Sequence, residues 1–218
     1  APYFWSVEEI LRRRVAEFDL VYVHRVANAV KYIPLVRRHL PHATVIYNVA
    51  DLHYLRTERQ RAVEGADSTG TRDEELKAQE LGAVAAADAV IVHSDHEKEL
   101  LSEAVPSARV DVVPWTFESA PVARPFHQRN GIAFVGGFRH APNLDAAHWV
   151  VREVMPLVWK SDPEVPIYLV GSNMPDSLKR LASDRVFPIG YVENLGDVFS
   201  KIRLTVAPLR YGAGLKGK

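Results

Sequence analysis

Eight short runs rich in β-branched residues recur along the 218-residue chain, and segments with helical spacing separate most of them. The runs lie at residues 20–23, 45–49, 89–92, 110–113, 132–135, 167–170, 186–189 and 204–207. Continuous apolar runs of this length predict strands that are buried on both faces of a sheet. Alternation of strands and helices predicts parallel sheets joined by right-handed crossovers, so we expect an α/β fold.

Helix starts can be read from the residues before the helical segments. Three of them have the form of a capping box: Ser6 with Glu9, Thr71 with Glu74, and Ser94 with Glu97. Asn143 is predicted to cap a fourth helix, over residues 144–160.

The alternation is interrupted between residues 115 and 130, where several prolines punctuate a stretch without a clear period. We interpret this stretch as a linker between residues 1–114 and residues 131–218. Each side carries four predicted strands, which favours two Rossmann-like parallel-sheet units facing each other across a cleft. We expect both units to be incomplete and the chain to be part of a longer protein.

Charge and composition exclude several classes of function. The chain has 27 Lys and Arg against 27 Asp and Glu and no Cys. Zero net charge argues against a nucleic-acid partner, since such binding depends on excess positive charge. Without Cys there is no disulfide framework, thiolate nucleophile or Cys-ligated zinc. No apolar run approaches the roughly 20 residues that cross a bilayer, no signal-peptide pattern opens the chain, and a cytoplasmic location is expected.

Glycines follow the predicted strands of the second half. Gly136 and Gly137 follow the first of these strands, and Arg139 and a helix start come next. Gly171 and Gly190 mark two further strand ends. Glycines let the backbone approach a ligand, and a helix N-terminus beside an arginine favours an anion such as a phosphate. A plain β-turn with an exposed arginine explains the first of these segments equally well.

The last segment, PLRYGAGLKGK, places Gly212, Gly214 and Lys216 directly after the last predicted strand. Its backbone N–H groups and its lysine could hold a phosphate. It is not a Walker loop, which needs a Ser or Thr after the lysine. A flexible turn with a solvated lysine is the alternative.

In the first half, Asp51 and His53 follow the second predicted strand. A carboxylate and an imidazole at a strand end could orient an acceptor hydroxyl or support a proton transfer. A helix N-cap by Asp51 is the alternative. No metal-binding motif such as His-Glu-x-x-His or a calcium loop is present.

The segments FVGGFRHAPNLDAAHW, PIYLVGS, VFPIGYV and APLRYGAGLKGK occur in that order. Together they resemble the donor-binding domain of retaining GT-B glycosyltransferases of the group 1, family 4 class. The segments ADAVIVHSDHEKELL and RVDVVPW resemble the end of that class's acceptor domain. The resemblance implies an acceptor-side unit over residues 1–114 and a donor-binding unit over residues 131–218.

The resemblance implies transfer of a sugar from a nucleotide diphosphate sugar to an acceptor hydroxyl with retention of configuration, and with neither a metal nor another cofactor. Polysaccharide biosynthesis is the process that it suggests. The expected partners are a UDP-, GDP- or ADP-linked sugar and a glycan, lipid or small-molecule acceptor, with peripheral membrane contact through regions outside this chain. The expected catalytic residues are Asp51, His53 and Lys216. The expected donor-binding residues are Gly136, Gly137, Arg139, Asn143, Gly171, Tyr191, Val192, Tyr211, Gly212, Gly214, Leu215 and Lys216.

The chain departs from the family pattern at four positions. Gly137 and Asn143 stand where the family usually has an arginine and a lysine, Ala213 replaces the first acid of its Glu-x7-Glu signature, and Ala50 replaces a histidine. Arg139 and Lys216 would then carry the positive charge at the diphosphate. A nucleotide-sugar epimerase of similar fold and a degenerate, non-catalytic nucleotide-binding module are the alternatives. A nicotinamide-binding dehydrogenase is disfavoured because neither half has the Gly-x-Gly-x-x-Gly fingerprint.

Overall fold

The computed structural model describes residues 5–65, 71–116, 118 and 124–214, and the chain forms two compact units. The first unit consists of Ala1–Thr116 together with Gly212–Leu215, and the second of Phe117–Tyr211 with Lys216–Lys218. The division after residue 116 lies close to the expected linker. The described residues Gly212–Gly214, which the sequence analysis placed in the second unit, group with the first.

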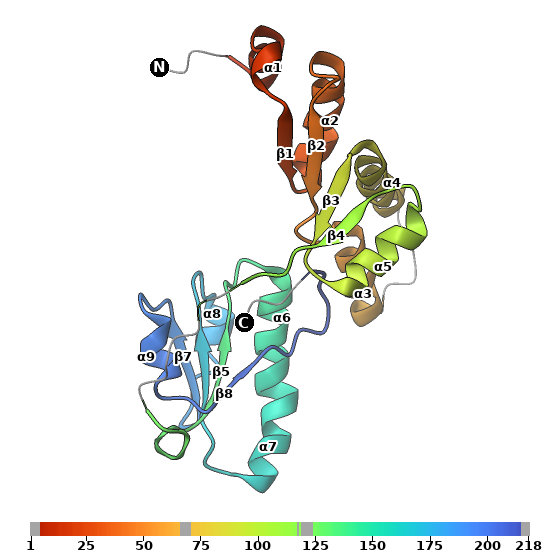
Figure 1. Cartoon of the computed structure of the whole chain (residues 1–218). Helices are drawn as coiled ribbons and strands as arrows, with labels where there is room; N and C mark the ends of the chain where they lie inside the picture. Colours follow the sequence, from red (N-terminus) through yellow and green to blue (C-terminus); the bar gives the residue numbers. More distant parts are fainter. Residues whose placement is uncertain (1–4, 66–70, 117, 119–123, 215–218) are drawn as a thin grey trace. The chain divides into compact units, whose positions relative to one another are not determined.

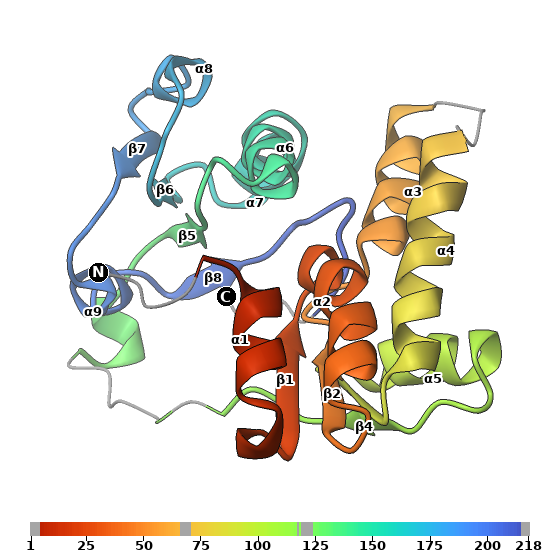
Figure 2. The same ribbon diagram turned by 90° about the horizontal axis from the view of Figure 1, so that it is seen from above.

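The first unit is a parallel four-stranded sheet in the order β1-β2-β3-β4, with helices between the strands (Figure 1). Its strands are β1 (Leu20–His24), β2 (Thr44–Asn48), β3 (Ala89–Val92) and β4 (Val110–Val112). Its helices are α1 (Val7–Arg13), the short 3-10 helix η1 (Val15–Glu17), α2 (Val26–His39), α3 (His53–Glu64), α4 (Thr71–Ala86) and α5 (Asp95–Ala104). In the view from above, α3 and α4 run side by side (Figure 2).

Burial in the first sheet alternates along the strands. Four side chains on the central strands are fully buried, namely Val45 and Tyr47 on β2 and Val90 and Val92 on β3. The residue between the two members of each pair is half-buried. Each strand of this sheet lies next to the one before it in the chain, so the connections all run in the same direction across the sheet. Right-handed connections that run in the same direction place their helices on the same face of the sheet. The expectation of strands buried on both faces is therefore wrong for this sheet.

The second unit is a parallel sheet in the order β7-β6-β5-β8. Its strands are β5 (Ile132–Val135), β6 (Ile167–Val170), β7 (Val186–Gly190) and β8 (Leu204–Val206). Its helices are η2 (Phe126–Gln128), α6 (Ala141–Trp149), the π-helical η3 (Val150–Val154), α7 (Met155–Ser161), α8 (Asp176–Lys179) and α9 (Leu195–Phe199). All eight predicted strands are thus present, and the α/β class with two Rossmann-like parallel-sheet units is confirmed.

Two predicted helix caps are wrong, since Thr71 is the first residue of α4 and Asn143 does not cap α6. The helix begins at Ala141 after His140, and Asn143 lies inside its first turn. Pro142, in that turn, has no N–H to donate, which suits the start of a helix. The side-chain amide of Asn143 donates instead to the Gly137 carbonyl oxygen at 2.9 Å, so it holds the turn before the helix.

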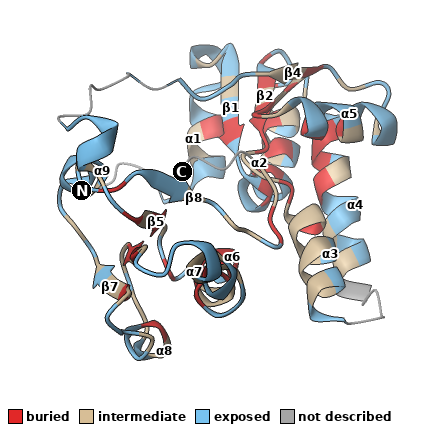
Figure 3. Ribbon diagram, turned by 90° about the horizontal axis from the view of Figure 1, so that it is seen from below, coloured by how far each residue is buried: buried red, intermediate tan, exposed pale blue. Residues whose placement is uncertain are grey.

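Each unit has its own hydrophobic core. In the first, Ile33 and Val36 of α2 and Leu101 of α5 pack on the sheet, and in the second Phe134 and Leu169 pack under Met155. Figure 3 shows buried residues concentrated on β2 and on one side of the neighbouring helices. Within the described ranges, no helix is both long and apolar enough to span a membrane.

Candidate functional site

The carboxyl edge of the second sheet is built by glycines that the backbone requires. Gly171 follows β6 with φ +151°, and a Cβ at this position would lie 1.9 Å from the Gly136 carbonyl oxygen. The Gly171 N–H donates to the Gly190 carbonyl oxygen at 2.7 Å, and the Gly136 N–H to that of Val170 at 2.9 Å. Three of the predicted glycine-marked strand ends therefore adjoin one another along β5, β6 and β7.

The turn after β5 leads into α6. Gly137 is exposed, and the side chain of Arg139 is exposed beside the start of the helix. Asn143 is buried, at 7% exposure, under this turn. A cationic side chain and a helix N-terminus are thus next to an edge with little side-chain bulk, an arrangement that suits an anionic ligand.

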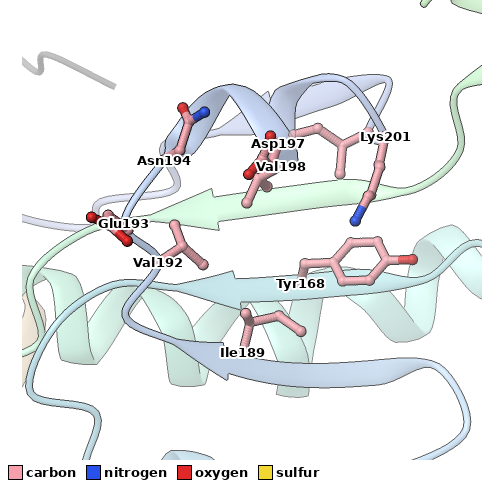
Figure 4. A pocket seen from close by; sticks show the side chains of 9 residues that line it. Tyr168, Ile189, Val192, Glu193, Asn194, Asp197, Val198 and Lys201 are labelled. Atoms are coloured by element: carbon pink, nitrogen blue, oxygen red, sulfur yellow. The ribbon is translucent and has the colours of Figure 1, made fainter.

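A pocket of about 360 Å³ opens between the second sheet and α9 (Figure 4). Tyr168 of β6, Ile189 of β7 and Val192 form much of its apolar lining, and Asp197 and Lys201 lie on its polar side. The predicted base-contact residue Val192 therefore lines a cavity. Its neighbour Tyr191 is 72% exposed, so its ring is free to contact a ligand.

The carboxyl edge of the first sheet carries Asp51 and His53. The Asp51 carboxylate accepts a hydrogen bond from the Arg56 guanidinium at 2.6 Å, and its Oδ1 lies 3.4 Å from His53 Nε2. Burial raises the pKa of Asp51, but the neighbouring His53 and Arg56 outweigh burial and lower it below its ordinary value. Ala50, just before this pair, has φ +65°, a conformation that non-glycine residues adopt mainly at strained sites. The N-cap of α3 is Leu52, so the alternative reading of Asp51 as that cap is wrong.

Leu52 has no side-chain oxygen to cap α3, and Glu80 of α4 accepts the first N–H groups of that helix instead. Its carboxylate is 0% exposed and accepts the N–H groups of His53 at 3.0 Å and Tyr54 at 2.8 Å. Burial raises the pKa of Glu80 despite these two bonds. Burial, Glu80 and Asp51 also raise the pKa of Tyr47, whose buried hydroxyl has no hydrogen-bond partner among the described residues. Sequence reasoning missed Glu80, because a glutamate in an alanine-rich helix gives no signal of burial.

Glu97 is the second buried carboxylate of this edge, at 2% exposure. The predicted N-cap is confirmed, since the Ser94 hydroxyl oxygen accepts the Glu97 N–H at 3.3 Å, while the Glu97 carboxylate accepts the Ser94 hydroxyl at 3.2 Å. In addition, Glu97 Oε1 accepts the Gly214 N–H at 3.0 Å. The capping-box spacing explained Glu97 fully at the sequence level, so nothing there indicated this second contact.

The structure brings the predicted residues together in two groups. Gly136, Gly137, Arg139 and Asn143 adjoin Gly171 in the second unit, whereas Asp51 and His53 adjoin Gly214 in the first. Leu215 and Lys216 lie outside the described residues. Over the described part of the chain, no group of three or more His, Asp or Glu side chains is arranged to hold a metal ion.

Comparison with known proteins supports the resemblance. Residues 129–218 match the family model described as "Glycosyl transferases group 1". A search of curated proteins gives no match. Solved structures with similar folds include TarM, with a TM-score of 0.66, 16% identity and coverage of 94% of this chain and 39% of that one.

Two further solved structures have similar folds at similarly low sequence identity. Sucrose-phosphate synthase from Thermosynechococcus elongatus has a TM-score of 0.66 and 19% identity, and the match covers 89% of this chain and 51% of that one. The E. coli structure described as trehalose-6-phosphate bound with UDP-2-fluoro glucose has a TM-score of 0.61 and 10% identity, covering 94% of this chain and 56% of that one. The chain thus spans between two fifths and about half of the length of these proteins. The chain thus has the fold of these solved structures, and its residues 129–218 are similar to the group 1 glycosyl transferase family.

Proposed function

We propose that the chain is part of a glycosyltransferase that moves a sugar from a nucleotide diphosphate sugar to an acceptor hydroxyl. The observation that carries this proposal is the match of residues 129–218 to the group 1 family, on a sheet whose carboxyl edge consists of closely packed backbone at Gly136 and Gly171, with little side-chain bulk. The UDP-sugar bound to the E. coli relative supports the same class of donor. Retention of configuration and independence of metal ions and cofactors are predictions from the resemblance, as is the cytoplasmic location.

In this proposal the second unit holds the donor. The nucleobase contacts Tyr191 and Val192, and the diphosphate lies over Gly136 and Gly137, with Arg139 beside it. Negative charge grows on the leaving diphosphate during transfer, so fixed positive charges that face it stabilise the transition state. Arg139 and Lys216 are the side chains proposed to supply that charge.

The first unit is proposed to bind the acceptor. Asp51 and His53 lie at the carboxyl edge of its sheet, where ligands of parallel α/β units bind. Asp51, whose pKa is lowered by His53 and Arg56 despite burial, is ionised at neutral pH, so it can accept a hydrogen bond from an acceptor hydroxyl or hold the His53 imidazole in place.

Calorimetric titration with UDP, GDP and ADP tests the donor site without an acceptor. We expect saturable binding of one nucleotide, weakened roughly ten- to a hundredfold by Arg139→Ala or Lys216→Ala, the range typical of a lost hydrogen bond to a charged group. Arg180→Ala, which removes an exposed arginine elsewhere in the second unit, is the matched control and should bind as the wild type does. Binding that both Arg139→Ala and Lys216→Ala leave unchanged would refute the assigned site.

A product assay on the full-length protein separates transfer from epimerisation. With donor and acceptor hydroxyl compounds present, a glycosyltransferase releases nucleoside diphosphate and forms a glycoside. Conversion of the donor without an acceptor would indicate an epimerase, and nucleotide binding without any conversion would indicate a non-catalytic module.

A further inference from the structure

Glu97 connects two segments that are distant in the sequence. Its Oε1 accepts the N–H of Gly214 at 3.0 Å and that of Leu52 at 3.4 Å, and its Oε2 accepts the Ser94 hydroxyl at 3.2 Å. A buried carboxylate is costly unless its oxygens are hydrogen-bonded. Here the donors come from Leu52 before α3, Ser94 before α5 and the distant Gly214.

A second side chain holds the same segment. The Arg59 guanidinium of α3 donates to the Gly212 carbonyl oxygen at 2.7 Å. The backbone of Gly214, with φ +72°, comes so close to the end of β2 that a Cβ there would lie 3.0 Å from the Ala50 carbonyl oxygen and 3.0 Å from the Asp51 Cβ. Residues 212–214, which we call the glycine segment, are therefore fixed on the Asp51 side of the first unit.

We propose that Glu97 is a positioning residue that holds the glycine segment against the Asp51–His53 segment. The effect of this contact on catalysis rests on the proposed function. In that proposal the glycine segment faces the diphosphate, and Glu97 and Arg59 hold it to the unit that binds the acceptor. One carboxylate oxygen bonds to the backbone of both segments, so it sets their separation. Glu97 acts on the reaction only through the backbone that it holds.

Amide hydrogen exchange at Gly214 tests the contact without any substrate. Ala213–Gly214 is the one Ala-Gly peptide bond in the sequence, so labelling with carbonyl-¹³C alanine and ¹⁵N glycine identifies the Gly214 amide in an NMR spectrum. We expect Glu97→Ala to increase the exchange rate of this amide by about tenfold or more, because it loses a charged acceptor. An unchanged rate would overturn the proposal.

Ser94→Ala is the control for loss of helix stability. It removes the N-cap of α5 and the hydroxyl that donates to Glu97 Oε2, but it leaves Glu97 Oε1, the acceptor of the Gly214 N–H, in place. We expect the exchange rate of the Gly214 amide, measured relative to the rates of the other glycine amides, to stay within about twofold of its wild-type value. An equal increase in Ser94→Ala and Glu97→Ala would show that the protection is only a consequence of overall stability, and would also overturn the proposal.

Two milder variants cover the case in which Glu97→Ala does not fold. Glu97→Gln keeps a carbonyl acceptor of the same reach, and Arg59→Ala removes the bond to Gly212 without touching Glu97. Each should increase Gly214 exchange severalfold, and no change in either would overturn the proposal. In the transfer assay, Glu97→Gln should recover most of the kcat that Glu97→Ala loses. If no transfer activity exists, the proposed function fails while the exchange result still stands.

Discussion

The close approach of Gly171 to Gly136 predicts a large effect of one added methyl group. In Gly171→Ala, the new Cβ would lie 1.9 Å from the Gly136 carbonyl oxygen, so β5 and β6 would have to separate by roughly 1 Å at this point. Overpacking of this kind costs about 1–3 kcal/mol. The positive φ of +151° adds a backbone penalty of about 1–3 kcal/mol, since only glycine adopts this region readily.

Gly190→Ala separates these two contributions. Gly190 also has a positive φ, of +80°, but a Cβ there meets nothing within 4 Å. It should therefore lose only the backbone penalty, about 1–2 kcal/mol. A difference of 1 kcal/mol shifts the Tm of a domain of about 100 residues, the size of the second unit, by about 4–8 °C. We therefore expect Gly171→Ala to melt at least about 5 °C below Gly190→Ala.

Differential scanning calorimetry on both variants measures this difference. Nucleotide titration should show weaker binding to Gly171→Ala, because the displaced strand end carries the turn at Gly136. Equal Tm values for the two variants would refute the argument, since they would show that the sheet edge accommodates the methyl group without strain.

Two further predictions concern the first unit. Glu80→Ala should lower the free energy of unfolding by about 2–4 kcal/mol in urea titrations, because two buried N–H groups lose their acceptor, whereas Gln79→Ala on an exposed site of the same helix should change it by less than about 0.5 kcal/mol. The pKa of Asp51 is lowered in the folded state by His53 and Arg56, against burial, so its stabilising contribution is present at neutral pH and is lost as the pH falls below its ordinary value of 3.8. The wild type should therefore lose stability more steeply than Asp51→Asn below about pH 4 in urea titrations, and parallel profiles would contradict this reading.

The strands and the site differ in how far the sequence predicts them. All eight strands were predicted within one or two residues, because short β-branched runs between helical segments leave few alternatives. The start of α6 was missed because two start signals compete there. Asn143 has the side chain of a cap, but Pro142 suits the first turn of a helix.

The contacts of Glu80, Glu97 and the glycine segment were beyond the reach of sequence patterns. Each joins residues that are far apart in the chain, and the separation between Glu97 and Gly214 is 117 positions. Local spacing explained Glu97 as part of a capping box. The structure confirms the cap by Ser94, but the Glu97 carboxylate bonds to Gly214, 117 positions away. A nucleotide bound to the second unit stays a prediction, since its site rests on the resemblance and on the geometry of the strand ends.

The contact between Glu97 and Gly214 also constrains the order in which the first unit folds during synthesis. Residues 1–116 leave the ribosome before residues 117–218, and Glu97 lacks its Gly214 donor until the 117 residues that follow Glu97 have been added. At the usual rates of synthesis this takes on the order of 10 seconds, long enough for a domain to fold. The first unit therefore begins to fold before the second exists, yet acquires its last hydrogen bonds only after the strands of the second have been synthesised.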